Sequence, residues 1–202
     1  MVYKVSLVNL QRCKYKTVKM NQEINNCLQV LRNGSIILYP TDTGWALGCD
    51  PTNAEAVKKI HNFKKADDFV CLVADDRMLK RYVKEIPKTA LDIIYITDKP
   101  TTIIYDSPQN LAANLIGEDT TIAIRIPDDD FCYQLSRRFN GAILAVTPSI
   151  GNDPAPQSFK DIDASILKGV DYVVNLQHEK NYNTKPSVIQ LSNTGLVKVI
   201  SI

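Results

Sequence analysis

The chain has 202 residues, 45% of them hydrophobic and 23% charged, which is an ordinary composition for a globular protein. A chain of this length favours one domain with one core, and we expect that domain to cover residues 1–202. No apolar run approaches the roughly 18 residues that cross a bilayer, and the first residues lack a signal-peptide pattern. These features argue against a membrane span and predict a cytoplasmic protein.

The charge of the chain is unevenly distributed. The net charge is +2, but residues 1–90 carry fifteen Lys or Arg and nine Asp or Glu, whereas the remainder carries nine and thirteen. A basic stretch in the first half could meet the phosphates of a nucleic acid, although a solvated helix face has the same composition. The residues of that stretch are Lys80, Arg81, Lys84 and Lys88.

The five cysteines are odd in number and widely spaced, and none forms a C-x-x-C pair. This pattern argues against a disulfide framework and against a zinc site. We expect most of them to be buried as small apolar residues. They are Cys13, Cys27, Cys49, Cys71 and Cys132.

The first predicted helix lies within residues 21–34. Its apolar positions follow the i, i+3, i+4, i+7 spacing of an amphipathic helix, and Asn33-Gly34 supplies a stop because both residues tolerate the left-handed conformation. A short, largely apolar run over residues 35–39 predicts a buried strand that ends at Pro40. A second helix is expected to begin at the capping-box spacing of Thr52 and Glu55.

Strands and helices alternate through the rest of the chain. Further strands are predicted at residues 69–73, 101–105, 122–126, 142–147 and 172–174, and further helices around 77–82, 89–95, 131–139 and 162–167. The last two strands, 186–191 and 196–200, are joined at Asn193-Thr-Gly195, which is a hairpin pattern. These elements predict an α/β fold: a single domain with a twisted, mixed parallel and antiparallel sheet flanked by helices.

The most unusual segment is Pro40-Thr-Asp-Thr-Gly-Trp-Ala-Leu-Gly48, which leaves the first predicted strand. It brings together two hydroxyls, a carboxylate and two glycines. Glycines let a backbone approach a ligand closely, and hydroxyls bond polar ligands directly. The alternative is a capped turn in which Asp42 and the threonines bond only their own backbone. The residues alone leave both interpretations open.

Several segments, in chain order, resemble motifs of one protein family. YPTDTGWALGCD is similar to a YPTDT-x-[YW]-G-[LI]-G-C-D motif, and NAEAVKKIHNFKK to a helix that ends in K-x-R. DKPTTIIY resembles a G-P-x-T-x-I-L segment, TIAIRIPDDDF a V-x-x-R-x-P strand, and ILAVTPSIGNDPAP lies where a T-S-A-N-x-S-G loop is usual. VDYVVN and PSVIQLSNTGLVKVI resemble the closing strands. The family is the YrdC-like family of threonylcarbamoyl-AMP synthases, and the resemblance covers residues 20 to 201.

The resemblance implies a YrdC-like open sandwich and a reaction that joins L-threonine, bicarbonate and ATP into threonylcarbamoyl-AMP and pyrophosphate. In the family, this product supplies the threonylcarbamoyl group of a tRNA adenosine. Mg²⁺ would accompany the ATP phosphates as cofactor. The reaction needs no covalent nucleophile, which fits the lack of a recognisable triad in the sequence.

The resemblance also assigns site residues by position. Threonine is expected to contact Thr41, Thr43, Trp45 and Arg125. The nucleotide is expected to contact Lys64, Lys65, Thr147 and Ser149. Lys64 and Arg125 are the candidate catalytic residues, because fixed cations can hold phosphate and carboxylate groups.

Three of these residues also have purely structural interpretations. Lys64 could be an exposed lysine in the last turn of a helix, where the helix dipole favours it. Arg125 could close an ion pair, because an unpaired charge in an apolar strand is costly. Trp45 could belong to the hydrophobic core.

The sequence departs from the family pattern on the ATP side. Ala66 stands where the K-x-R motif has its arginine, and Asp67-Asp68 follows directly. Two carboxylates at that place would repel a triphosphate. Ser149 replaces the asparagine of the T-S-A-N-x-S-G loop, and Lys99 replaces the glycine of G-P-x-T, where we expect it to crowd the site.

The sequence therefore predicts a divergent threonylcarbamoyl-AMP synthase-like protein with weak ATP affinity and impaired turnover. The alternative is a non-catalytic paralogue that binds double-stranded RNA or tRNA. A third interpretation is a small-molecule sensor that keeps only the amino-acid pocket.

Overall fold

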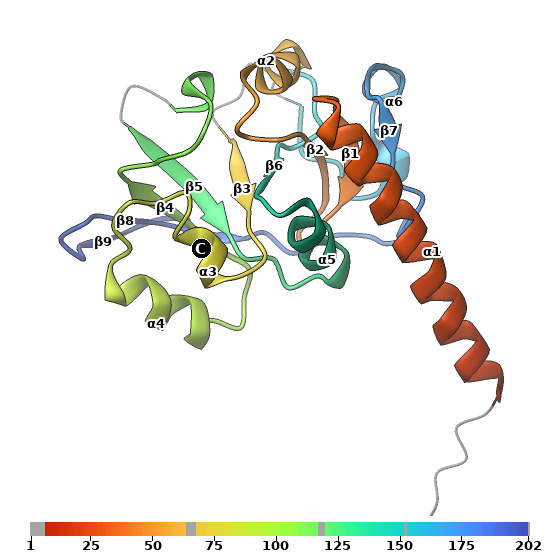
Figure 1. Cartoon of the computed structure of the whole chain (residues 1–202), viewed down its shortest axis with the longest axis horizontal. Coiled ribbons are helices and arrows are strands. Elements are labelled where there is room, and N and C mark those ends of the chain that lie inside the picture. The colour runs from red at the N-terminus through yellow and green to blue at the C-terminus, as the bar shows by residue number, and fades with distance from the viewer. Residues whose placement is uncertain (1–6, 64–67, 117–119, 152, 202) are drawn as a thin grey trace, which may run out of the picture.

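The computed structural model describes residues 7–63, 68–116, 120–151 and 153–201, and for residues 7–14 it describes the backbone alone. It contains two sheets with helices packed around them (Figure 1). The strands are β1 (Ile37–Pro40), β2 (Trp45–Gly48), β3 (Val70–Leu72), β4 (Thr101–Asp106), β5 (Thr121–Arg125), β6 (Ile143–Ala145), β7 (Tyr172–Val173), β8 (Ser187–Leu191) and β9 (Val197–Ser201). The helices are α1 (Leu7–Arg32), α2 (Ala54–Phe63), α3 (Asp76–Leu79), α4 (Lys88–Ile96), α5 (Asp130–Phe139) and α6 (Ala164–Gly169), with 3-10 turns η1 (Ala113–Leu115) and η2 (Phe159–Asp161).

The two sheets are joined through β2 and β6. The smaller sheet has the order β2-β1-β7 and the larger the order β6-β3-β5-β4-β8-β9. Leu47 N donates to Val146 O at 2.8 Å and Val146 N donates to Leu47 O at 3.0 Å, so β2 continues the larger sheet. The β1–β7, β3–β5 and β4–β8 pairs are parallel, and the other pairs are antiparallel. The mixed α/β sheet and the terminal β8–β9 hairpin predicted from the sequence are confirmed.

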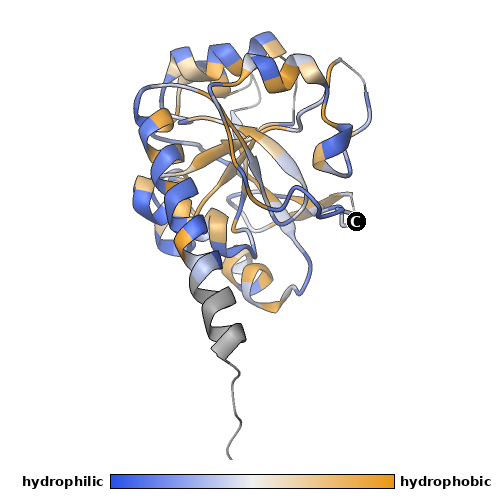
Figure 2. Ribbon diagram, turned by 90° about the vertical axis from the view of Figure 1, so that its right-hand side faces the viewer, coloured by the Kyte–Doolittle hydropathy of each residue, from blue (hydrophilic) through white to orange (hydrophobic). Residues whose placement is uncertain are grey.

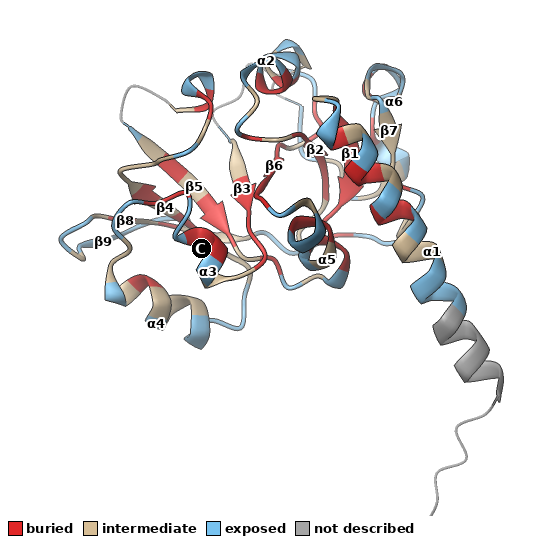
Figure 3. Cartoon of the chain, viewed as in Figure 1, coloured by how far each residue is buried: buried red, intermediate tan, exposed pale blue. Residues whose placement is uncertain are grey.

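Neighbouring residues of the strands face two different hydrophobic cores, because side chains alternate across a sheet. Leu38 of β1 packs in the larger core with residues of α2, whereas Ile37 and Tyr39 pack in the smaller core with residues of α1 and α5. Figure 2 shows hydrophobic residues along the central strands, and Figure 3 shows that these strands are buried between the helices. This alternation decides which strand residues remain available for a site.

Helix α1 is longer than predicted. Its C-terminal part carries the predicted stripe, and Ile24 and Leu31 are buried in the smaller core. Tyr15 and Val18 are exposed, and the N-terminal part of the helix projects from the body (Figures 1 and 2). The sequence did not indicate this extension because residues 7–20 lack a regular apolar stripe. No helix in the described ranges is both long enough and apolar enough to cross a membrane.

Two local features differ from the sequence-based expectations. The predicted capping box at Thr52 and Glu55 is wrong: Asn53 Oδ1 accepts from the backbone N of Glu55 and of Ala56 at 3.1 Å each, so Asn53 caps α2. The Thr52 hydroxyl instead donates to Asp50 Oδ1 at 2.7 Å. Strand β2 was not predicted, because its segment resembles a glycine-bounded loop.

Four cysteines are buried free thiols, as expected, namely Cys27, Cys49, Cys71 and Cys132. Burial raises the pKa of the Cys71 thiol to about 12. These thiols therefore stay protonated at neutral pH and act as small apolar groups. The side chain of Cys13 lies outside the described residues.

Candidate functional site

A pocket of about 380 Å³ lies over the larger sheet, on the same face as the smaller core. Ala46 and Ala145 belong both to that core and to the pocket wall. Strands β3, β4, β5 and β8 also contribute residues to the wall, as do the turn after β1, the loop after β6 and the segment before β8. The pocket thus gathers residues from most of the motifs that carry the resemblance.

The floor of the pocket follows from the alternation of side chains along the strands. In β5, Ile122 and Ile124 point into the larger core, whereas Ala123 and Arg125 line the pocket. In β4, Ile103 is a core residue and Thr102 lines the pocket. Small side chains on this face leave room above the sheet, and the few larger polar ones can meet a ligand.

The turn between β1 and β2 forms one wall and is closed by its own first residue. Thr41 N and Thr41 Oγ both donate to Gly44 O, at 2.8 and 2.7 Å, and Thr41 Oγ accepts from Thr43 N at 3.2 Å. The capped-turn interpretation is therefore confirmed for Thr41, although this residue also lines the pocket. Thr43 lines the pocket as well, and its hydroxyl does not bond the turn backbone in the same way.

Arg125 is buried, with 5% of its side chain exposed, and it lines the pocket. Its Nη2 donates to Asp42 Oδ1 and to Thr43 Oγ at 3.0 Å each, and its Nη1 donates to Thr102 Oγ at 3.5 Å. The structural ion pair that the sequence left open is present. Arg125 Nε has no hydrogen-bond partner among the described residues, so one donor of the guanidinium is uncommitted.

Asp42 is the buried partner of that ion pair, with 4% of its side chain exposed. Burial raises the pKa of the Asp42 carboxyl above its ordinary 3.8, and the neighbouring Arg125 guanidinium opposes this shift. The pair fixes the turn after β1 against β5. Removal of either partner would leave an uncompensated charge beneath the pocket.

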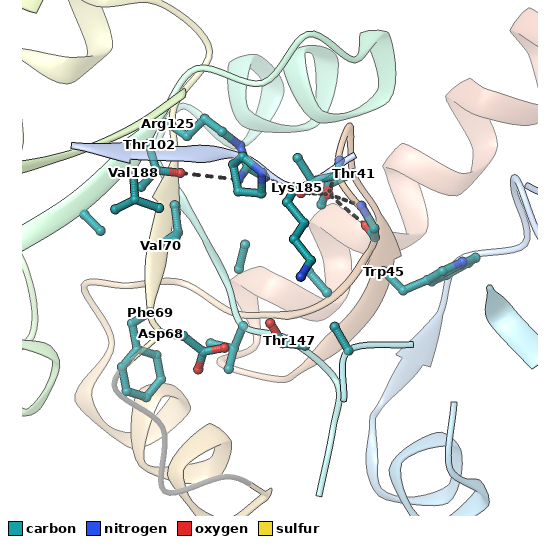
Figure 4. A pocket seen from close by; sticks show the side chains of 18 of the residues that line it. Thr41, Trp45, Asp68, Phe69, Val70, Thr102, Arg125, Thr147, Lys185 and Val188 are labelled. Atoms are coloured by element: carbon teal, nitrogen blue, oxygen red, sulfur yellow. Dashed lines mark hydrogen bonds between the residues drawn. The ribbon is translucent and has the colours of Figure 1, made fainter. Parts of the chain in front are cut away.

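The structure brings some of the other predicted residues to the pocket and leaves others aside. Thr147 lines it (Figure 4). Trp45 also contributes to the wall, but its ring packs on Phe159 and His178 with centroid distances of 4.9 and 5.3 Å, as expected for a core aromatic. Ser149 is buried but is not part of the described wall, and its Oγ has no partner among the described residues.

Three further expectations concern charged residues on the ATP side. Lys64 and Lys65 lie outside the described residues, so their phosphate contacts stay predictions. Asp68 lines the pocket, as the expected repulsion of a triphosphate by this carboxylate requires. The expectation that Lys99 crowds the site is wrong, because Lys99 is exposed and lines a neighbouring hollow formed with Asp98 and Asp128.

Lys185 and Thr102 are pocket residues that the sequence reasoning missed. Figure 4 shows Lys185 reaching into the pocket from the segment before β8, with its ammonium directed toward Asp68 and Thr147. A lysine directly before the closing Pro-Ser run was the available signal for Lys185. The sequence does not show that Lys185 reaches the pocket, because this depends on the parallel pairing of β8 with β4, in which Ser187 lies opposite Thr101.

The protein thus has an α/β fold with a hollow suited to a small polar ligand, because a few hydroxyls and cations converge on its mostly apolar wall. The chain belongs to the Sua5/YciO/YrdC family, whose model, described as "Telomere recombination", matches residues 29–200. The resemblance drawn from the motifs is confirmed.

Similar proteins include enzymes and solved structures. A threonylcarbamoyl-AMP synthase from Coxiella burnetii is 27% identical over 178 residues, which are 86% of this chain and 95% of that protein. One from Hahella chejuensis is 26% identical, with 86% and 96% covered. The structure of E. coli YciO superposes with a TM-score of 0.76 at 23% identity, covering 88% of this chain and 87% of YciO. The structure of P. abyssi Sua5 complexed with L-threonine gives a TM-score of 0.73 at 22% identity, and this chain covers half of it.

Proposed function

We propose that the protein is a threonylcarbamoyl-AMP synthase-like enzyme and that the pocket is its active site. The threonine nitrogen would attack the bicarbonate carbon with loss of water, and a carbamate oxygen would then displace pyrophosphate from the α-phosphorus of ATP. The observation that carries this proposal is the convergence of the Thr41–Gly44 turn, Arg125 and Thr147 on one pocket. We place the reaction in the cytoplasm, in the service of tRNA modification.

The amino-acid side of the proposed site is the wall formed by Thr43 and Arg125. The Thr41 proton is used on Gly44 O, and Thr43 Oγ accepts from Arg125, so the Thr43 proton has only a long contact of 3.4 Å with Thr41 Oγ, which a ligand can replace. Arg125 Nη1, whose contact with Thr102 Oγ is long at 3.5 Å, is a second donor. Two donors on one wall suit the carboxylate of threonine or the carbamate that forms from it.

The nucleotide side of the proposed site contains Thr147 and Asp68, with Lys64 and Lys65 as further proposed phosphate contacts. Mg²⁺ is usually bound by one or two carboxylates together with substrate phosphates. Asp68 supplies such a carboxylate in the wall, so the described residues fit an ion that arrives with ATP. Within the described ranges, no cluster of three or more His, Cys, Asp or Glu could hold a metal without that help.

Release of pyrophosphate tests the proposal. We expect release that requires ATP, L-threonine, bicarbonate and Mg²⁺ together, at a low rate because Ala66 replaces the family's arginine. Thr43→Val should lower kcat/KM for threonine by about tenfold or more, since it removes a hydrogen bond to a charged group. Thr194→Val, in the exposed β8–β9 hairpin, is the matched control. Pyrophosphate release that does not depend on threonine, or that Thr43→Val leaves unchanged, would contradict the proposal.

RNA binding is the second candidate function, and the observation that favours it is the exposure of the basic stretch. Lys80, Arg81, Lys84 and Lys88 are all exposed. Arg81 is partly committed, because its Nη1 donates to Asn140 O at 2.8 Å. Such a surface could hold tRNA or double-stranded RNA by its phosphates, with or without catalysis in the pocket.

A further inference from the structure

Lys185 is held at the edge of the pocket by structure on both sides. On its C-terminal side, Ser187 N donates to Pro100 O at 2.9 Å and begins the parallel pairing of β8 with β4. On its N-terminal side, Tyr182 N donates to Gln157 O at 2.8 Å. Thr184, Lys185 and Pro186 all line the pocket. The segment that carries the lysine is therefore anchored at Tyr182 and at Ser187, and the lysine itself is exposed.

The charges of the described pocket wall are unequally engaged. Its ionic residues are Asp68, Arg125 and Lys185. The Arg125 charge is compensated by Asp42 at 3.0 Å. Within the described residues, no hydrogen bond or ion pair engages the Lys185 ammonium, which points into the pocket (Figure 4). Lys185 is thus a cation of the described wall that no ion pair holds, and it points to the side of the pocket where Asp68 and Thr147 lie.

We propose that Lys185 binds a phosphate group of the ligand and forms a phosphate subsite with the Thr147 hydroxyl. Lysine binds phosphate as a compact point charge with three donors, whereas the bidentate geometry that suits a carboxylate belongs to Arg125. The Lys185 ammonium is directed toward Thr147 and away from Arg125 (Figure 4). A phosphate subsite at this place separates the nucleotide side of the pocket from the amino-acid side.

This subsite would replace a positive charge that the chain lacks at the arginine position of the family's K-x-R motif. Ala66 stands where the family pattern has an arginine, and Asp67-Asp68 adds negative charge beside it. Lys185 approaches the same pocket from the segment before β8. The assignment of the phosphate to ATP rests on the proposed function, whereas the binding of phosphate does not.

Calorimetric titration with inorganic pyrophosphate, ATP, adenosine and L-threonine tests the subsite. Lys185→Met should weaken pyrophosphate and ATP binding by about 10- to 100-fold, because it removes one charge-assisted hydrogen bond, and leave adenosine and threonine binding unchanged. Lys185→Arg should retain most of the affinity. Lys198→Met, which removes an exposed lysine of β9 outside the pocket wall, is the matched control for net charge.

The outcomes separate this inference from the proposed enzyme activity. Phosphate binding that depends on Lys185, in a protein that releases no pyrophosphate with threonine, supports the subsite and contradicts the enzyme. Threonine-dependent release that Lys185→Met leaves unchanged supports the enzyme and overturns the subsite. The subsite is also overturned if the natural protein binds neither pyrophosphate nor ATP, if Lys198→Met is equally damaging, or if Lys185→Met weakens threonine binding instead.

Discussion

At Arg125, one buried guanidinium faces Asp42 on one side and the pocket on the other. The sequence offered a ligand role and a structural ion pair as alternatives, but the geometry is compatible with both at once. The ion pair and the Thr43 hydrogen bond occupy Nη2, whereas Nη1 makes only a long contact of 3.5 Å with Thr102 Oγ and can turn to a ligand. An arginine that is held rigidly in this way loses little conformational freedom when a ligand binds.

A double-mutant cycle measures how strongly Arg125 and Asp42 depend on each other. Arg125→Met and Asp42→Asn should each lower the free energy of unfolding by about 3–5 kcal/mol, because each leaves one buried charge without its partner. The double variant should be less destabilised than the sum of the two, which urea denaturation would detect. Additive losses would mean that the two charges do not interact. Asp42→Asn should also retain anion binding, whereas Arg125→Met should lose it.

The pH dependence of stability gives a second view of Asp42. Burial raises the pKa of its carboxyl above 3.8 and Arg125 opposes the shift, so the pKa should rise further in Arg125→Met. An acid with a raised pKa binds its proton more tightly in the folded state, so stability increases as the pH falls toward the ordinary carboxyl value. The stability deficit of Arg125→Met should therefore shrink as the pH is lowered from neutral. A constant deficit across thermal melts in that window would show that Asp42 is not the cause.

Asp68 gives a prediction that depends on magnesium. Its carboxylate lines the pocket, where it would repel the phosphates of metal-free ATP and would help to bind a phosphate-bound Mg²⁺. Asp68→Asn should therefore strengthen ATP binding severalfold in EDTA and weaken it in excess Mg²⁺. Calorimetry under the two conditions checks this reversal. If Asp68→Asn changed ATP affinity in the same direction under both conditions, Asp68 would not be a ligand of the metal.

At the scale of the elements, the sequence predicted those helices and strands whose apolar residues follow a regular local pattern. The apolar stripe of α2 and the alternation through β4 and β5 were readable, because burial on one face fixes the residue types there. Strand β2 was missed because Gly44 and Gly48 bound it, and its state depends on pairing with β1 and on its bridge to Val146 after β6. The extension of α1 was missed because no core residue marks it.

The residues of the candidate site also fall into those that the sequence predicted and one, Lys185, that it did not. Thr43, Thr147 and Arg125 were found because they stand in motifs of a known family, and the structure brings them to one pocket. Lys185 could not be found in this way, because its position depends on the long connection from β7 and on the register of β8 against β4. Long-range register is the information that a single sequence does not expose.

Gly48 tests how tightly the two sheets are joined. A Cβ at this position would lie 2.5 Å from Tyr39 Cε1 and 2.9 Å from Leu144 O. The Tyr39 ring cannot easily give way, because it is fully buried and its hydroxyl donates to Leu144 O at 3.0 Å. Gly48→Ala should therefore lower the free energy of unfolding by about 1–3 kcal/mol, as overpacking does.

Gly141→Ala is the control for this substitution, since neither glycine has a positive φ. The closest atom to a Cβ at Gly141 is Tyr82 Oη at 3.2 Å, which is a tight contact and not an overlap. Its loss of stability in urea denaturation should be the smaller of the two. The reverse order would mean that the junction of β2 and β6 is looser than the distances indicate.

At the scale of the whole molecule, positive charge is concentrated in one part of the chain. The first twenty residues contain five Lys or Arg and no Asp or Glu, and the rest contains nineteen basic against twenty-two acidic residues. The described part of this segment belongs to α1, which projects from the body (Figures 1 and 2). Of the five basic residues, Lys16 and Lys19 have described side chains, and Lys16 is exposed on this part of α1, the arm, where it could meet a nucleic-acid phosphate.

RNA affinity should then depend on this arm and on the basic stretch near α3. We expect double-stranded RNA or tRNA to bind with an affinity that falls steeply with salt, because the binding of phosphates releases counterions. Lys16→Glu on the arm, and Lys80→Glu with Lys84→Glu near α3, should weaken binding across unrelated sequences and lower the salt slope by about one for each phosphate that is no longer neutralised. Arg81 is left in place, since its bond to Asn140 O would confound the result.

Fluorescence anisotropy over a salt series checks both surfaces, with Lys198→Glu as the charge-matched control on β9. Binding that is undetectable or independent of salt would remove RNA from the partners of this protein and leave the pocket as its functional site.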